Sequence, residues 1–241
     1  MINVRDNLNN LIEIYEFLSQ LVLELGEKEL YKPILIPYYH GKIKKDCGVS
    51  CFTFLKNGGY LTFHIFEKRK IAYFDIVSTN KIDKKIVTSV TSFCQTNKFN
   101  IYKNEINVQD RNSFFGPHYF AEGKLRKKLN TDELLDFQNE IIKGIKMTPI
   151  INPIIVKTNK TQTLFVAIAE SHIALTKTDN VLRVDVFSCK EFDINELKQI
   201  AYKFIDVQEE VLFTRHSKVV SAQQQGCIHF NFINKQSKSR V

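Results

Sequence analysis

The sequence predicts an α+β protein in which one unit of helices and strands occurs twice. The two copies are expected to form two antiparallel β-sheets packed face to face with helices outside, an αββα sandwich. Strand-like runs follow one another through short turns, which favours antiparallel pairing. Helix-like segments stand before and after each set of strands. The second half of the chain repeats the order of the first, which indicates an internal duplication.

The first repeat begins with a helix. Residues 6–25 place apolar side chains three and four positions apart, and Gly26 ends the pattern. A Pro-flanked strand follows in "KPILIPYYHGK". The segment "SCFTFLKNGGYLTFHIF" predicts two strands joined at Asn57-Gly58-Gly59, a strong hairpin signal. After a further strand in "KIAYFDIVS", residues 83–97 are expected to form a helix with Asp83 as its N-cap.

The second repeat presents the same elements in the same order. Residues 131–146 predict a helix with Thr131 as N-cap and an acidic first turn. The segments "TPIINPIIVK", "TQTLFVAIAESHIALTKT" and "NVLRVDVFSCKEFDINELKQIAYKFI" correspond to the strands and helix of the first half. Over the last of these the separation is a constant 110 residues, which pairs Asp75 with Asp185, Ser78 with Ser188 and Asp83 with Asp193.

These correspondences place the first repeat at residues 1–110 and the second at 111–241, together forming one compact structural unit. The second repeat has a strand, "GPHYFAEG", before its helix, whereas the first shows none there. The terminal segment "GCIHFNFI" alternates like a strand. We therefore expect it to return and complete the sheet of the first repeat.

Composition and charge exclude several classes of protein. The net charge of +8 comes from dispersed lysines without a basic helix or a nucleic-acid-binding motif, so no nucleic-acid partner is expected. No run approaches about 18 apolar residues, so no membrane partner is expected. The polar start "MINVRDNLNN" does not resemble a signal peptide, and the cytoplasm is the expected location.

The cysteine pattern favours reduced thiols. The chain has five cysteines, an odd number, without a secretory signal. Cys47 and Cys51 have a spacing that some zinc sites use, but no second Cys or His pair at ligand spacing follows them. No metal site is therefore expected.

The two repeats differ at four polar positions. The second has Glu170-Ser171-His172 where the first has the turn Asn57-Gly58-Gly59, and Cys189 stands opposite Thr79. Conversely, the first has Ser50 and His64 where the second has Thr163 and Thr176 with Lys177. Each residue alone has a structural explanation, as a polar hairpin tip, a buried cysteine or a core histidine. Together they favour one site assembled from both halves.

These segments resemble the S-adenosylmethionine decarboxylases, the pyruvoyl-dependent enzymes of spermidine, and hence polyamine, biosynthesis. "FVAIAESHIAL" followed by "VDVFSC" is similar to the family's self-cleavage and proton-donor segments. "CGVSCFTF", with His64 beyond it, resembles the family's Gly-Val-Ser strand and the catalytic histidine that follows. "GPHYFAEG" resembles its first strand. The resemblance covers most of the chain.

The resemblance implies an autocatalytic cleavage of a zymogen between Glu170 and Ser171. Ser171 would attack the Glu170 carbonyl to give an ester, β-elimination would break the chain, and the former Ser171 would become a covalent pyruvoyl group. That group would form a Schiff base with the substrate's α-amine and accept the electrons released with CO₂. Cys189 would then return a proton as general acid. Ser50 and His64 match the family's processing serine and histidine.

Several positions depart from the family pattern. The family's His-Thr-Trp-Pro-Glu segment uses its glutamate to bind the ribose hydroxyls, but "HIFEK" places Lys68 at that position and Glu67 one residue earlier. Phe120 matches one adenine-stacking aromatic residue, and Lys44 occupies the place of the other. The plant and animal enzymes are also duplicated, but they carry the pyruvoyl in the first half.

Three functions remain open. The resemblance implies a lyase that decarboxylates S-adenosylmethionine to the aminopropyl donor for spermidine. A relative acting on ornithine or arginine would need the same chemistry without an adenine slot. An inactive homologue that regulates an active partner is the third, although retention of the four polar residues argues against it. If the protein is one of the two enzymes, we expect a small-molecule substrate and cleaved chains that stay associated. A homodimer is a further expectation.

Overall fold

The computed structural model describes residues 10–38, 47–68, 71–78, 80, 82–95, 99–103, 114–168, 171–217 and 228–234. It divides into two compact units. Unit 1 comprises Met1–Glu105 with Val220–Val241, and unit 2 comprises Ile106–Val219. Each unit contains one six-stranded sheet and two helices. The predicted α+β class, with a duplicated unit, two sheets and four helices, is confirmed.

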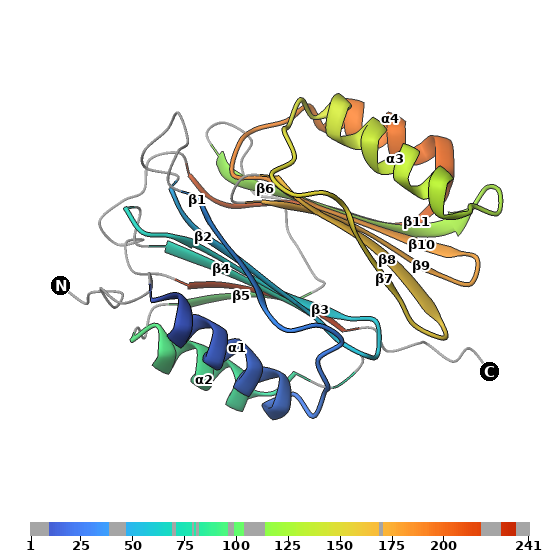
Figure 1. The fold of residues 1–241 in the computed structure, drawn as a ribbon. Helices are drawn as coiled ribbons and strands as arrows, with labels where there is room; N and C mark the ends of the chain where they lie inside the picture. Colours follow the sequence, from blue (N-terminus) through green and yellow to red (C-terminus); the bar gives the residue numbers. More distant parts are fainter. Residues whose placement is uncertain are drawn as a thin grey trace. The chain divides into compact units, whose positions relative to one another are not determined.

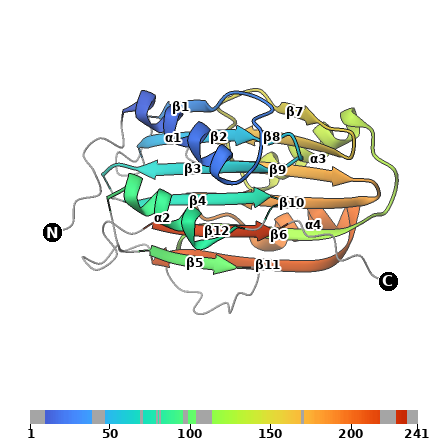
Figure 2. The same ribbon diagram turned by 90° about the horizontal axis from the view of Figure 1, so that it is seen from below.

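In unit 1, two helices cover one face of a sheet (Figure 1). The strand order is β1-β2-β3-β4-β12-β5, as Figure 2 shows. The elements are α1 (Leu11–Glu24), β1 (Ile34–Tyr38), β2 (Gly48–Phe54), β3 (Tyr60–Phe66), β4 (Ile71–Ser78), α2 (Lys84–Phe93), β5 (Phe99–Lys103) and β12 (Ile228–Asn234).

The C-terminal strand completes this first sheet. Strand β12 pairs with β4 and with β5, which confirms the expectation that the end of the chain returns to the first repeat. Both pairings are parallel, whereas β1 to β4 pair antiparallel. The sheet is therefore antiparallel except at β12. The reason is topological, because a strand that arrives from the far end of the chain is not bound to the direction that a hairpin imposes.

In unit 2, every strand pairing is antiparallel, and the strand order is β11-β6-β10-β9-β8-β7. Helices α3 and α4 cover one face of this sheet (Figure 1). The elements are β6 (Phe114–Leu125), α3 (Thr131–Gly144), β7 (Ile154–Lys157), β8 (Thr161–Ala167), β9 (His172–Thr178), β10 (Val181–Phe187), α4 (Ile194–Phe204) and β11 (Ile205–Ser217).

Asparagine caps fix the starts of the first helix in each unit. The Asn10 side chain accepts hydrogen bonds from the first turn of α1, so this helix begins at Leu11, and residues 6–9 of the predicted helix lie outside the described residues. Asn130 caps α3, and the Glu133 side chain accepts the Asn130 backbone N–H in return. The predicted Thr131 cap is therefore wrong by one residue. Asp83 caps α2 as predicted.

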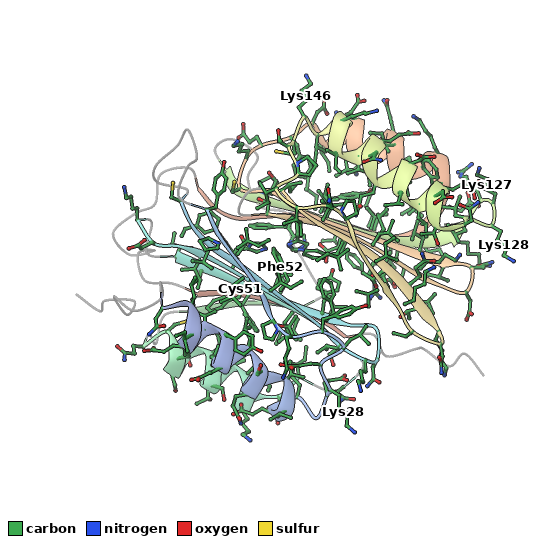
Figure 3. All side chains as sticks on the ribbon, viewed as in Figure 1. Lys28, Cys51, Phe52, Lys127, Lys128 and Lys146 are labelled. Carbon is green, nitrogen blue, oxygen red and sulfur yellow. The ribbon has the colours of Figure 1, made fainter. Side chains whose placement is uncertain are left out.

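Alternation along the strands sorts side chains between the two faces of each sheet. Cys51 and Phe52 are neighbours on β2 and point to opposite faces, with Cys51 on the helix side (Figure 3). In unit 1 the helix-side core joins α1 and α2 to alternate residues of β2, β3 and β4. In unit 2 the corresponding core joins α3 and α4 to β6, β8, β9 and β10. The face away from the helices carries the polar residues considered next.

Candidate active site

Ser171 is buried where the hairpin turn joins β9. It immediately precedes β9, and only 1% of its surface is exposed. The Ile168 N–H donates to the Ser171 carbonyl oxygen at 3.0 Å, which closes the turn between β8 and β9. A polar turn at a sheet edge is ordinarily solvated. Burial at this turn therefore places the hydroxyl in a low-dielectric setting where its hydrogen bonds control its reactivity.

Cys189 contacts Ser171 through its backbone. The Cys189 N–H donates to the Ser171 Oγ at 2.8 Å, and the Cys189 side chain is buried. Cys189 follows β10 by two residues, and Ser188 N–H is held by the Pro117 carbonyl of β6. The turn after β10 is thus anchored to the neighbouring strand. Two residues predicted from separate motifs are in direct contact.

Ser50 and His64 form a second pair, in unit 1. They are cross-strand partners on β2 and β3, and the Ser50 Oγ lies 2.9 Å from the His64 Nδ1. Both side chains are fully buried on the face away from the helices. The edge of the His64 ring packs on Phe52, with centroids 5.6 Å apart. This is the pairing of a hydroxyl with a base that activates serines in enzymes.

The equivalent pair in unit 2 lacks a base. Thr163 and Thr176 are cross-strand partners on β8 and β9, with their Oγ1 atoms 3.1 Å apart. Strands β2 and β8 have equal length, as do β3 and β9, so Thr163 occupies the place of Ser50 and Thr176 that of His64. The correspondence inferred from the sequence is confirmed.

The register also refines the comparison of the two hairpin turns. His172 begins β9 as Tyr60 begins β3, so Ser171 corresponds to Gly59. A Cβ atom on Gly59 would lie 2.0 Å from the Val77 carbonyl oxygen and 3.1 Å from the Leu55 side chain. The turn in unit 1 therefore has no room for a serine at this position, which explains why only the second repeat carries a serine there.

A carboxylate and two imidazoles lie beside Ser171 in unit 2. The Asp185 Oδ1 lies 2.5 Å from His118 Nε2 and 3.5 Å from His172 Nε2. All three residues are buried. Burial by itself raises the pKa of the Asp185 carboxyl. The charge and hydrogen bond of His118, with a contribution from His172, outweigh burial and hold that pKa well below its usual range.

Sequence reasoning gave His118 and Asp185 no role and left His172 unassigned. A signal was present, because Asp185 lies inside the largely apolar run "VLRVDVF" and His118 directly precedes the apolar residues "YFA". Buried ionisable residues in such runs require partners. The partner becomes visible only when β6 and β10 are paired, since the two residues are 67 positions apart.

The predicted substrate residues are less closely grouped. Phe120 lies on the same face of β6 as His118, two residues further along. Its ring faces the Arg183 guanidinium at 5.3 Å, and Arg183 is paired with Glu122. Glu67 follows β3 in unit 1 and is exposed, as is Lys68. Glu170 lies outside the described residues, as does Lys44.

The surroundings of Ser171 fit the group that the resemblance implies. A pyruvoyl group formed from Ser171 would keep its place at the start of β9, within reach of the Cys189 turn. Within the described residues, Cys47 and Cys51 are buried and form no disulfide, and burial raises the pKa of Cys51 strongly. The lysines labelled in Figure 3, such as Lys146, are exposed at the surface. None of the described helices has the length and apolarity needed to cross a membrane.

No protein-family model matches the chain, and no curated protein matches it. One solved structure that is similar to part of it is the crystal structure of the adenosylmethionine decarboxylase from Aquifex aeolicus VF5. The two have 14% sequence identity and a TM-score of 0.34, over 46% of this chain and 97% of that one.

Proposed function

We propose that this protein is a self-processing, pyruvoyl-dependent decarboxylase that acts on S-adenosylmethionine. One observation carries the proposal. Ser171 and Cys189, named by two separate sequence motifs, are in contact through a 2.8 Å hydrogen bond at a buried turn. Antiparallel pairing of β9 with β10 places the two segments side by side, but a polar hairpin tip of ordinary kind would be solvated, whereas Ser171 and Cys189 are both buried.

The first role of Ser171 is that of nucleophile. Its Oγ attacks the Glu170 carbonyl carbon, and the Ser171 nitrogen leaves as a free amine, which gives an ester. The Cys189 N–H donates to the Ser171 Oγ at 2.8 Å, so it holds the attacking oxygen in one position before the acyl shift.

β-Elimination then separates the chains. A base removes the α-hydrogen of residue 171, and the bond between Cβ and Oγ breaks, so that the oxygen leaves with the new Glu170 carboxylate. One water molecule then releases ammonia and leaves the pyruvoyl group. When formed, this group supplies the ketone that accepts electrons as the substrate loses CO₂.

The Ser50–His64 pair is assigned to processing. The buried hydroxyl and imidazole are 2.9 Å apart, which is the distance required for proton transfer between them. Cys189 is assigned to turnover, where its thiol protonates the α-carbon after CO₂ has left. The thiol and the backbone N–H of one residue thus serve different steps.

The direct test is the covalent state of the purified protein. We expect denatured protein to separate into chains 1–170 and 171–241, with the smaller chain lighter by one ammonia than simple hydrolysis would give. Ser171→Ala should remain one chain. An uncleaved wild-type chain would contradict the proposal and favour the inactive regulatory homologue.

Cys189→Ala separates the two roles of that residue. The substitution keeps the backbone N–H that bonds Ser171 Oγ, so cleavage should proceed at a rate close to that of the wild type. Removal of a general acid typically costs about 10²–10⁴-fold in rate, so decarboxylation should fall by that factor. The measurements are a cleavage time course and CO₂ release. Loss of cleavage together with turnover would show that the assignment of the thiol is wrong.

A second substrate class is favoured by the environment of Phe120. The Arg183 guanidinium occupies one face of its ring, held in place by two hydrogen bonds to Glu122. An adenine could use only the opposite face. Ornithine and arginine need no such slot and use the same pyruvoyl chemistry. Release of labelled CO₂ from the three candidate substrates decides between them, and Phe120→Ala should lower turnover only if an adenosyl group binds there.

A further inference from the structure

The buried cluster beside Ser171 has no part in the chemistry described so far. We infer that His118 and Asp185 are positioning residues for self-cleavage, which act by fixing the ring of His172 and with it the backbone that carries Ser171. The inference rests on the proposed function and adds residues to it. It concerns the uncleaved chain, in which peptide bonds join Ser171 to residue 170 on one side and to His172 on the other.

The charges of the cluster support a fixed arrangement. An ionised carboxylate inside a protein requires a cation or strong donors. The His118 Nε2 lies 2.5 Å from the Asp185 Oδ1 and supplies such a donor. The His172 Nε2 lies 3.5 Å from the same Asp185 oxygen. His118 makes the direct hydrogen bond, whereas at His172 only the tautomer with its hydrogen on Nε2 turns an N–H dipole toward the carboxylate. Asp185 thereby selects one tautomer of His172, as carboxylates do for histidines in other enzymes.

Aromatic neighbours restrict the His172 ring further. The Phe165 ring stacks on it, with centroids 5.5 Å apart and planes 14° apart. The Phe187 ring packs against both histidines, at 6.0 Å from His172 and 5.6 Å from His118. These contacts come from β8 and β10, the two strands that flank β9. A ring held on both sides leaves the first residue of β9 little freedom.

The position of His172 transmits this restraint to the cleavage point. His172 pairs with Ala167 across the hairpin, and the Ser171 carbonyl oxygen accepts from Ile168 N–H at 3.0 Å. Ser171 is therefore held from its carbonyl side by the hairpin and from its Oγ side by Cys189. Nucleophilic attack requires alignment within a few tenths of an ångström, and a displacement of about 1 Å can cost about 100-fold in rate.

The same three side chains have the residue types of a metal site, with ligand atoms within 4.8 Å of one another. The distance of 2.5 Å between His118 Nε2 and Asp185 Oδ1 favours a direct hydrogen bond instead. Two ligands of one tetrahedral ion, each about 2.0–2.1 Å from the metal, stand further apart than this. The geometry is that of a charge-assisted hydrogen bond.

The test compares cleavage rates of freshly synthesised chains. Asp185→Asn and His118→Leu should slow the appearance of chain 171–241 by about 100-fold. His118→Gln, which can still donate to Asp185, should recover part of this loss. The matched control is Tyr119→Phe on the opposite face of β6 from His118, which removes a partly buried 2.7 Å hydrogen bond to Glu210 of β11. It should lower stability but leave the cleavage rate unchanged.

A spectroscopic measurement separates positioning from general destabilisation. In the uncleavable Ser171→Ala chain, ¹⁵N-histidine spectra should show His172 in the Nε2–H tautomer, and Asp185→Asn should give a mixture. An Nδ1–H tautomer of His172, or one equivalent of bound zinc by elemental analysis, overturns the inference. So does an Asp185→Asn chain that is cleaved at the wild-type rate. A wild-type chain that is never cleaved overturns the proposed function and, with it, the inference.

Discussion

At the scale of single residues, the second repeat concentrates its polar chemistry on one end of three strands. Ser171 and His172 stand at the start of β9, Cys189 just after β10, and His118 on β6. Each is buried, so each must find its partner inside the protein. Ser171 contacts Cys189, and His118 and His172 both lie beside Asp185. The reactivity of this cluster is consequently set by neighbours rather than by solvent.

Asp185 should make the stability of the protein sensitive to acid. Its pKa is lowered in the folded state by His118 and His172 in spite of burial. Its contribution is therefore fully present above the ordinary aspartate pKa of about 3.9 and is lost as the pH falls through the lower folded value.

We expect Asp185→Asn to cost about 3–5 kcal/mol in free energy of unfolding at neutral pH, because it leaves His118 without its counterion. The variant should also show a flatter loss of stability below about pH 4. Urea titrations across pH test both. Equal acid sensitivity in the two proteins would mean that Asp185 is not ionised in the folded state.

At the scale of elements, the two β-hairpins explain why one site exists rather than two. Strands of equal length flank both turns, but the turn in unit 1 runs from Leu55 to Gly59 and that in unit 2 from Ile168 to Ser171. Gly58 adopts a positive φ of 83°, a conformation that favours glycine. Gly59 passes so close to β4 that a side chain has no space. The first hairpin is therefore a purely structural turn.

Gly59→Ser tests this reading of the turn. The new Cβ would meet the Val77 carbonyl oxygen at 2.0 Å, so the backbone has to shift. We expect a loss of about 1–3 kcal/mol in stability and no cleavage in the first repeat. Thermal unfolding and mass spectrometry measure the two effects. Gly58→Ala provides the comparison, since Gly58 has a positive φ of 83° that an alanine rarely adopts. A stable, normally folded Gly59→Ser protein would show that the turn accommodates a side chain.

At the scale of the whole molecule, the end of the chain belongs to the unit that contains its beginning. Strand β12 lies between β4 and β5, so unit 1 needs residues from both ends of the sequence. In unit 2 the equivalent place, second from the edge of the sheet, is taken by β6, which precedes α3 in the chain. Two sheets with matching strands are thus completed in two different ways.

Removal of residues 220–241 should open the first sheet. Strand β5 pairs with β12 alone within the described part of the sheet, so it loses its place when β12 is absent. We expect amide hydrogen exchange in β4 and β5 to accelerate by at least about tenfold, while β8 and β9 keep their protection. A chain ending at residue 234 retains β12 and is the control. Unchanged exchange in β5 would contradict the observed strand order.

The amino-acid pattern alone determined the fold class, the duplication and most elements. Local signals suffice there, because the Asn57-Gly58-Gly59 turn, the Asp83 cap and the spacing of apolar residues act over a few positions. The pattern also indicated Ser171 and Cys189 by resemblance. The local signal is ambiguous at the starts of two helices. Asn10 and Asn130 are their N-caps, whereas the sequence pattern predicts a helix over residues 6–25 and a cap at Thr131.

Only the tertiary structure decided what depends on contacts between distant residues. The parallel pairing of β12, the contact between Cys189 and Ser171, and the cluster of His118 with Asp185 all join positions far apart in the chain. Their energies come from burial and from hydrogen bonds that form only when strands are in register. Sequence fixes which residues alternate onto a face, but pairing and register decide which of them meet.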